Sequence, residues 1–496
     1  MIMNSKKIVI IGAGFAGLAS AALLAKDGHE VLVIEKNDMS GGRARVWKES
    51  GFSFDMGPSW YLMPDAFEKF FAKFNKKPED LYKLIRLDPS YRIFFGPNDI
   101  LDIKASLDEN IKLFESLETG AGQKLVEYLE QAKYQYDVSM SQFLYKNFKS
   151  VFDFFNKRMM DEGRKLHVFE NLDKFTKRFF KNERLRKVLQ YSMVFLGGAP
   201  SNTPALYSVI NHADFNLGVW YPYGGFSSVA IAIQKLAESY GAKFVFNSEV
   251  KEIVVEDGVA KKVITTDSGY DADVVVGNGD YHHIETALLP KKYQSYSTRY
   301  WKKRTMAPSA FILYLGLNKK LSNLKHHNLM LSNDWEKHFN AIFDNPSWPT
   351  EPSYYVCAPA QTDASVAPEG KENLFVLVPI ASGLSETPEF REEYAQKIIS
   401  HMENEIGETF ADSIIVKRIF TGVDFAKDYN AFQGTALGLS HTLFQTAMLR
   451  PRMKSKKVAN LYFAGQYTQP GIGVPMALIS GELTHKNISE DNEQNK

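Results

Sequence analysis

A glycine turn near the N-terminus constrains the fold of this chain more than any other feature of its sequence. Gly12, Gly14 and Gly17 have the spacing G-x-G-x-x-G and follow a strand-like run at residues 7–11, of which residues 8–11 are β-branched. An apolar stretch comes next, and a second strand-like run follows at residues 30–35. This order of strand, glycine turn, helix and strand is typical of a nucleotide-binding βαβ unit. The sequence therefore predicts an α/β fold with a doubly wound, Rossmann-type domain.

The turn is predicted to bind a diphosphate through backbone N–H groups at the start of the helix. These groups have no partner inside the helix, and the helix dipole adds positive charge there. An acid at the end of the second strand can hold the hydroxyl pair of a ribose, and Glu35 stands 18 residues after Gly17. The residues assigned to this part of the site are Gly12, Ala13, Gly14, Phe15, Ala16, Gly17, Glu35 and Lys36. A structural glycine turn in an ordinary α/β unit is the alternative.

The same segment also imitates a membrane-spanning helix or a signal peptide, because residues 8–25 carry no charge and follow two lysines. The three glycines interrupt it, its first four residues are β-branched, and a second strand follows. These details favour the βαβ unit.

Two further segments favour FAD over NAD. The pair Gly41-Gly42 precedes Arg43, and such a segment can wrap around the diphosphate of a long ligand. The sequence DMGPSW follows at residues 55–60, where a plain NAD domain would continue with more βα units. We therefore predict FAD as the cofactor. The residues assigned to it here are Gly42, Arg43, Gly57, Pro58, Ser59 and Trp60.

The other end of the chain repeats the strand–turn–helix pattern. Residues 461–464 are typical of a buried strand, residues 470–475 (PGIGVP) of a rigid turn, and residues 476–486 of a helix. A second helix N-terminus at the ligand is expected from this order, and a terminal βα hairpin without a ligand is the alternative. The residues assigned to the cofactor here are Gly465, Gln466, Gly473, Val474 and Pro475.

Taken together, GAGFAG, Glu35, GGRAR, DMGPS and AGQYTQPGIGVP resemble the FAD-dependent carotenoid desaturases of the bacterial phytoene desaturase type. Middle segments at residues 195–198, 220–225, 278–280 and 358–370 extend the resemblance over almost the whole chain. It implies that Val250 contacts the adenine through its backbone and that Asn278 belongs to the cofactor site. Gln466 to Gln469 depart from the pattern of many members, in the segment that the resemblance implies lies near the flavin ring.

The resemblance implies a long-chain carotenoid substrate and the insertion of a conjugated double bond. A hydride would pass to flavin N5 and a proton would leave the adjacent carbon, with oxygen or a quinone as the final electron acceptor. Phytoene converted toward lycopene is the leading expectation. The alternatives are a hydroxycarotenoid or γ-carotene 3,4-desaturase, a C30 diapophytoene desaturase, a carotenoid isomerase, a flavin amine oxidase, and a non-catalytic FAD-bound carotenoid carrier.

Motifs at both ends imply a discontinuous FAD domain made of residues 1–67, 224–289 and 431–488. Within it, a helix is expected at 227–240, with strands at 243–246, 249–256, 259–265 and 270–277. A substrate domain of mixed sheet is assigned to residues 68–141, 188–223 and 290–430, a helical lid to 142–187, and a flexible tail to 489–496.

The predicted lid has an unusual composition. Residues 142–187 contain 13 Lys and Arg against 6 Asp and Glu, together with nine Phe. Rings beside cations suit a helix that lies on an anionic membrane surface, and the resemblance implies such contact. A lid whose rings face the protein core is the alternative.

The composition of the whole chain excludes other classes. Its 59 Lys and Arg balance 58 Asp and Glu in 496 residues, which argues against a nucleic-acid coat protein. The single cysteine, Cys357, excludes an internal disulfide and fits a reduced cytoplasmic compartment, with the protein held peripherally at the membrane. The pairs His282-His283 and His326-His327 lack further ligand spacing, so no metal site is predicted.

Candidate acid–base residues are few. Glu130 and Lys133 are three residues apart on an expected helix and share a face. The resemblance implies a catalytic role, because they match the position of an acidic–arginine pair in relatives. A surface ion pair is the alternative.

Overall fold

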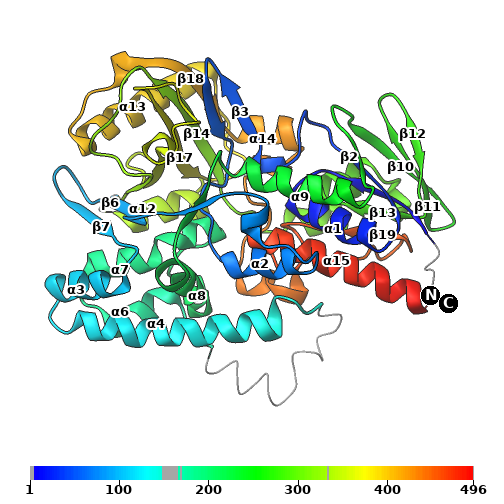
Figure 1. Ribbon diagram of the computed structural model, residues 1–496, viewed down its shortest axis with the longest axis horizontal. Helices are drawn as coiled ribbons and strands as arrows, with labels where there is room; N and C mark the ends of the chain where they lie inside the picture. The colour runs from blue at the N-terminus through cyan, green and yellow to red at the C-terminus, as the bar shows by residue number, and fades with distance from the viewer. Residues whose placement is uncertain (1–4, 148–165, 168–169, 332–333, 495–496) are drawn as a thin grey trace.

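A five-stranded parallel sheet forms the centre of one half of the molecule, on the right in Figure 1. The computed structural model describes residues 5–147, 166–167, 170–331 and 334–494. The strand order is β19-β13-β1-β2-β9. The bounds are β1 Lys7–Ile11, β2 Glu30–Ile34, β9 Lys243–Val245, β13 Val274–Gly277 and β19 Leu461–Phe463. The sheet therefore unites strands from near the beginning, the middle and the end of the chain.

Helix α1 (Phe15–Lys26) packs between α9 (Ser227–Ser239) and α15 (Val474–Gln494) beside this sheet. Residues Phe15 to Ala25 are all buried, which explains the uncharged run that imitates a membrane span. Small residues let the helices approach, since a Cβ on Gly481 of α15 would lie 2.5 Å from the Ala16 carbonyl oxygen. Among the described residues no helix is both long and apolar enough to cross a membrane.

A three-stranded antiparallel sheet follows β9 and contains β10 (Val250–Glu256), β11 (Val259–Thr265) and β12 (Gly269–Asp271). Its first hairpin turns at Asp257-Gly258 as predicted, with both residues at positive φ. The single strand expected at 270–277 is wrong. The chain leaves β12, crosses Ala272-Asp273, and enters the parallel sheet as β13, because Val274, Val275 and Val276 are fully buried there.

A seven-stranded mixed sheet dominates the second half, at the upper left of Figure 1. Its order is β18-β14-β17-β16-β15-β6-β7, and the β15–β6 pair is parallel while the other pairs are antiparallel. The bounds are β6 Tyr91–Phe94, β7 Ile100–Ile103, β14 Ser309–Leu317, β15 His327–Met330, β16 Tyr354–Cys357, β17 Glu372–Ile380 and β18 Ile414–Phe420. All nine residues of β14 are buried, and α13 (Pro388–Ile406) contributes its apolar side to the same core as β14 and β17.

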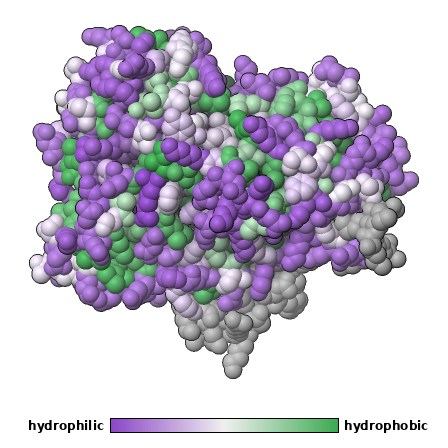
Figure 2. Space-filling view, in the orientation of Figure 1, coloured by the Kyte–Doolittle hydropathy of each residue, from purple (hydrophilic) through white to green (hydrophobic). Residues whose placement is uncertain are grey.

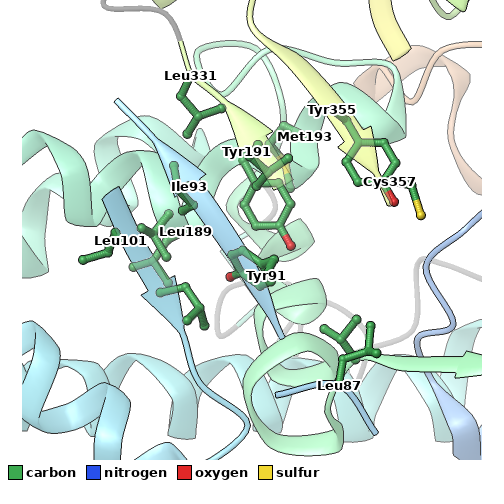
Figure 3. Close-up of a cluster of buried hydrophobic side chains, with 14 of the residues drawn as sticks. Leu87, Tyr91, Ile93, Leu101, Leu189, Tyr191, Met193, Leu331, Tyr355 and Cys357 are labelled. Carbon is green, nitrogen blue, oxygen red and sulfur yellow. The ribbon is translucent and has the colours of Figure 1, made fainter. Parts of the chain in front are cut away.

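A layer of helices lies below this sheet in Figure 1. It contains α3 (Leu107–Leu117), α4 (Ala121–Val138), α6 (Leu172–Phe179), α7 (Glu183–Gln190) and α8 (Val209–His212). Figure 3 shows part of the core between layer and sheet, where Tyr91 and Ile93 of β6 approach Leu189 of α7 and Tyr191. The face drawn in Figure 2 is mostly hydrophilic, with apolar side chains gathered in separate patches.

The remaining helices and strands connect these layers. They are β3 Val46–Glu49, β4 Phe52–Asp55, α2 Pro64–Ala72, β5 Leu84–Arg86, β8 Trp220–Pro222, α10 Tyr281–Ala287, α11 Thr298–Lys302, α12 Trp335–Phe339 and α14 Gly422–Tyr429. The β3–β4 hairpin lies inside the predicted cofactor segment 1–67, yet it packs on the seven-stranded sheet. Phe52 and Phe54 enter the core that contains Tyr314 of β14.

The described part of the predicted lid, at residues 142–147, 166–167 and 170–187, turns aromatic rings toward the protein core. Phe175 and Phe180 are buried, and their rings lie 5.5 Å from that of Tyr128 and 5.7 Å from that of Phe114. The five Phe at 148, 152, 154, 155 and 169 lie outside the described residues. Membrane contact by this stretch stays a prediction.

The tail predicted at 489–496 is wrong for residues 489–494, which continue α15. Asp491 pairs with Lys454 at 2.7 Å and accepts a hydrogen bond of 2.5 Å from the Tyr462 hydroxyl. These contacts with Tyr462 of β19 and with Lys454, which forms an isolated bridge to Tyr462, extend the helix past the end predicted at residue 486.

Candidate active site

A cavity of about 1130 Å³ joins the two halves of the molecule. One part is lined by the ends of β1, β2 and β13, and the other by apolar side chains that include Leu166, Leu206, Ile210 and Leu377. The carboxyl ends of parallel strands are the usual place for a ligand in an open α/β sheet. The cavity is therefore the candidate site for both a cofactor and an apolar substrate.

The predicted glycine turn lies in the cavity wall. Gly12 has a φ of +103°, and Gly14 precedes α1 without a side-chain cap, so the first N–H groups of the helix remain available to an anion. Asn278, at the end of β13, donates its amide to the Gly12 carbonyl at 3.0 Å and to the Gly14 carbonyl at 3.3 Å. Gly17 does not line the cavity; its missing Cβ is what lets the Gly12 carbonyl and Asn278 lie so close.

Glu35 lies at the end of β2 and is buried. One carboxylate oxygen accepts from the Ala13 N–H at 2.7 Å, and the other accepts from the Asn37 N–H at 2.9 Å. The carboxylate thereby fixes the turn, and it also lines the cavity where a ribose would lie. Ala13 contributes through this bond rather than by lining the cavity.

The segment that contains Gly41 and Gly42 packs against the glycine turn at residues 12–14. The Gly41 N–H donates to the Ala13 carbonyl at 2.8 Å, and a Cβ on Gly42 would lie 3.3 Å from the Cα of Gly14. Beside them, the Arg43 guanidinium lies 5.2 Å from the centre of the Tyr429 ring, and its Nε is buried without a hydrogen-bond partner. A close backbone cradle beside a half-buried cation with one buried, unused donor fits a diphosphate.

The other residues assigned to the cofactor also line the cavity. They are Phe15, Ala16, Lys36, Gly57, Pro58, Ser59, Trp60, Val250, Gly465, Gln466, Gly473, Val474 and Pro475. Gln466 presents its amide oxygen to both terminal nitrogens of Arg43 at 3.2 Å when the amide is turned to satisfy the two groups. Lys36 donates to the Lys427 carbonyl at 2.6 Å, so it joins α14 to the site rather than facing a phosphate.

Several cavity residues were missed by the sequence reasoning. Asp280 accepts from the Tyr467 hydroxyl at 2.6 Å, and its place two residues after Asn278 was a usable signal. His441 bonds through Nδ1 to the Tyr207 hydroxyl at 2.7 Å, while its Nε2 accepts from the Ile472 N–H at 3.0 Å. Burial lowers the pKa of His441 well below its usual value. No motif marks His441, because its partners come from distant segments.

A hydrogen-bonded wall faces the apolar part of the cavity. The Ser59 and Tyr355 hydroxyls lie 2.8 Å apart, and the Tyr355 hydroxyl lies 2.6 Å from Nδ1 of His327. The Trp60 ring stacks on the His327 ring, with centroids 4.3 Å apart and planes 6° from parallel. Burial lowers the pKa of His327 well below its usual value, so the wall is neutral.

A buried carboxylate supports this wall from behind. Asp214 accepts from the hydroxyls of Tyr91 at 2.8 Å and Tyr191 at 3.2 Å, and Tyr191 lines the cavity. Burial raises the pKa of Asp214 to about 7, and the two hydroxyl donors oppose that rise.

Glu130 and Lys133 are not brought to the cavity. Both are exposed on α4, and Lys133 pairs with Asp137 at 2.5 Å. The opposite side of α4 buries Tyr128, Leu129, Ala132 and Tyr136, so the helix turns the pair toward solvent. We correct the sequence-based assignment accordingly and give the pair no acid–base role.

Comparison with known proteins agrees with this site. The chain matches the family described as "Flavin containing amine oxidoreductase" over residues 15–486. The protein is thus an oxidoreductase whose cofactor is FAD, and the preference for FAD over NAD is confirmed.

Two curated relatives match over nearly their whole length. The chain is 44% identical over 491 residues to a carotenoid 3,4-desaturase from Haloarcula japonica, with 99% of each chain covered. It is 32% identical over 494 residues to a zeta-carotene-forming phytoene desaturase from Myxococcus xanthus, covering 98% of this chain and 94% of the relative. The chain belongs to the carotenoid desaturase family within the flavin-containing oxidoreductases.

Solved structures share the fold. An oxidoreductase from Methanosarcina mazei matches with a TM-score of 0.62 at 18% identity, over 97% of this chain and 100% of that chain. A fatty acid isomerase from P. acnes matches with a TM-score of 0.59 at 15% identity, over 98% of each chain. The predicted α/β architecture with mixed sheets is confirmed.

Proposed function

We propose that the protein is an FAD-dependent carotenoid desaturase that adds a double bond in conjugation with an existing polyene. The observation that supports this most is one continuous cavity with the cofactor cradle in one part and apolar side chains in the other. A rod-like hydrocarbon needs such a path, because its binding energy comes from burying apolar surface. Bound FAD would supply the hydride acceptor.

Within this class we propose desaturation of the 3,4 bond near one end of the carotenoid. The support is the 44% identity to a carotenoid 3,4-desaturase, against 32% to a phytoene desaturase of similar coverage. Conversion of phytoene toward lycopene is the second candidate, supported by that relative of 32% identity.

The chain's own residues act mainly by placement. Loss of a hydride next to a polyene leaves a delocalised allylic cation, and the adjacent C–H of such a cation is strongly acidic. A weak acceptor is then sufficient if it is well positioned. The hydroxyls of Ser59 and Tyr355 line the cavity and are already hydrogen-bonded to each other, so they are placed to receive this proton. The apolar lining excludes water, which would otherwise capture the cation.

Product analysis tests the proposal. Purified FAD-loaded protein is incubated in liposomes with phytoene, γ-carotene and a hydroxylated carotene, and the products are separated by chromatography. We expect a carotene with a saturated 3,4 bond to gain conjugation and absorb at longer wavelength. Protein without FAD is the control for background oxidation. If no carotenoid gains conjugation in fully loaded protein while an amine such as putrescine is oxidised, the protein is an amine oxidase instead.

We also propose that oxygen or a quinone removes the electrons. The same assay under nitrogen, with and without an added quinone, separates the two acceptors. Turnover without either would contradict both.

Peripheral association with the cytoplasmic side of a membrane is part of the proposal. Phe444 and Leu449 have 76% and 47% of their surface exposed, and they flank Thr446 and Ala447, which line the cavity. Exposed apolar side chains beside an apolar cavity suit insertion into the interface of a bilayer. We expect the double variant Phe444→Ser/Leu449→Ser to sediment less with liposomes, whereas Ile415→Ser, an exposed apolar position on β18, should not change sedimentation. Wild-type protein that stays in the supernatant would contradict the membrane proposal.

A further inference from the structure

Three side chains of metal-ligand type meet behind the cavity wall. His327 of β15 lies directly opposite Cys357 of β16 in the antiparallel ladder, and His326 precedes His327. The three residues are between 0% and 4% exposed. One ligand atom from each lies within 4.8 Å of the other two. The register of two strands thus supplies the third ligand that the spacing along the sequence did not reveal.

The hydrogen bonds of the two rings leave one nitrogen of each unused. Nδ1 of His326 is 2.9 Å from the Thr362 hydroxyl, and Nδ1 of His327 is 2.6 Å from the Tyr355 hydroxyl. Nε2 of each ring is buried and has no hydrogen-bond partner. Histidines that bind a metal commonly donate the other ring N–H to a second group, which fixes the ring and its tautomer. Two adjacent histidines therefore both have the arrangement of an oriented metal ligand.

The chemistry of the three groups selects the type of ion. Nε2 of each ring has no hydrogen-bond partner, and a neutral imidazole nitrogen is what binds a metal. Imidazole and thiolate suit zinc(II) and copper(I), whereas magnesium and calcium prefer oxygen. The buried carboxylate of Asp363 is engaged by the Tyr221 hydroxyl and the Gly224 N–H.

We propose that His326, His327 and Cys357 bind one zinc(II) or copper(I) ion. On binding, the Cys357 thiol releases its proton to solvent and the thiolate forms the metal–sulfur bond, so no oxidant or reductant is needed. Metal–ligand bonds of about 2.0–2.3 Å put ligand atoms roughly 3.5 Å apart. The side chains must close by about an ångström to reach this geometry.

The three proposed ligands do not line the reaction cavity, but they adjoin it beside Trp60, one of the residues assigned to the cofactor. His327 stacks on Trp60 and bonds to Tyr355, and both partners line the cavity. In Figure 3 the Tyr355 hydroxyl and the Cys357 sulfur lie side by side at the end of β16. An ion here would tie β15 to β16 and hold the wall. This inference does not depend on the identity of the substrate.

Metal analysis of the tag-free holoprotein tests the proposal. The protein is dialysed against zinc(II), or against copper(I) without oxygen, and then passed over a desalting column. We expect about one ion per chain in wild-type protein and less than a tenth of that in Cys357→Ala and His326→Gln. His485→Gln is the control, because His485 is on α15 and pairs with Asp27. It should keep the wild-type content. The metal that is retained distinguishes zinc from copper.

A second measurement covers variants that fail to fold. The melting temperature of wild-type protein should fall when a chelator removes the ion and recover when the ion is returned, with FAD content unchanged. Wild-type protein that retains neither ion, or Cys357→Ala and His326→Gln proteins that both retain the wild-type amount, would overturn the site. Because the readouts are bound metal and melting temperature, the outcome is independent of the desaturase assay.

Discussion

Replacing Gly17 by alanine should weaken FAD binding and lower the stability of the protein, although Gly17 does not line the cofactor site. The added methyl group would lie 2.3 Å from the Gly12 carbonyl oxygen and 2.5 Å from Nδ2 of Asn278. Ordinary contacts need about 3.4 Å or more, so the overlap is close to an ångström against backbone on one side. The Asn278 amide would have to leave its bonds to the Gly12 and Gly14 carbonyls.

The magnitude follows from opposing contributions. Overpacking against a backbone costs about 3 kcal/mol, and the two weakened hydrogen bonds add about 1 kcal/mol. Alanine gains about 1 kcal/mol over glycine inside a helix. The net strain is therefore about 3 kcal/mol. It is relieved either when the protein unfolds or when the turn shifts away from the diphosphate. In the second case the same free energy corresponds to roughly 100-fold weaker FAD binding.

Urea unfolding of the protein without FAD, together with fluorescence titration of FAD, measures both outcomes. The matched control is Gly279→Ala, in the same wall, where the added Cβ would meet Ile284 at an ordinary 3.5 Å. The reasoning would be refuted if Gly17→Ala bound FAD within about threefold of wild type and lost less than about 0.5 kcal/mol of unfolding free energy.

Three further predictions have defined outcomes. Glu35→Gln removes a charged acceptor of backbone N–H groups, so FAD should bind about 10- to 100-fold more weakly by titration, whereas Glu30→Gln at an exposed position should bind normally. Glu130→Gln and Lys133→Ala should both retain wild-type turnover of a carotenoid, because the pair faces solvent; a loss above about tenfold in either would restore a catalytic role. Asp214→Asn should flatten the pH dependence of stability. The pKa of Asp214 is raised from 3.8 to about 7, so the folded wild type keeps a proton that the unfolded chain loses between these values. Its stability therefore falls as pH rises through this window, by up to about 4 kcal/mol, and is constant above it. Urea unfolding at pH 5 and pH 8 measures this, and an equal pH dependence in the variant would contradict the assignment.

The cofactor cradle could be predicted because its chemistry is local. Gly12, Gly42 and Gly473 all have positive φ, a backbone requirement that glycine identity reports directly. Glu35 ends a strand whose period and length were readable. A diphosphate is bound mostly by backbone N–H groups, and short sequence motifs predict the backbone geometry that presents them.

The substrate wall and the His–Cys cluster could not be predicted in this way. Cys357 lies opposite His327 because of the register in which β15 pairs with β16. The long connection between these strands contains α12 and an irregular segment, so the sequence does not reveal that register. The solvent orientation of Glu130 was readable, since Tyr128, Leu129 and Ala132 mark the buried side of α4. The resemblance indicated where Glu130 and Lys133 lie along the chain. It did not indicate which side of the helix faces solvent.

The packing of the first helix on the last has a consequence for how the protein is made. A ribosome releases α1 more than 400 residues before α15, and α1 has eleven of its twelve residues buried in the finished fold. Until β19 and α15 have been synthesised, this apolar helix lacks one of its packing partners. The nascent chain therefore exposes a hydrophobic surface of the kind that chaperones bind. FAD capture is therefore expected to be an event of late synthesis, and chains stalled before residue 461 should accumulate without flavin.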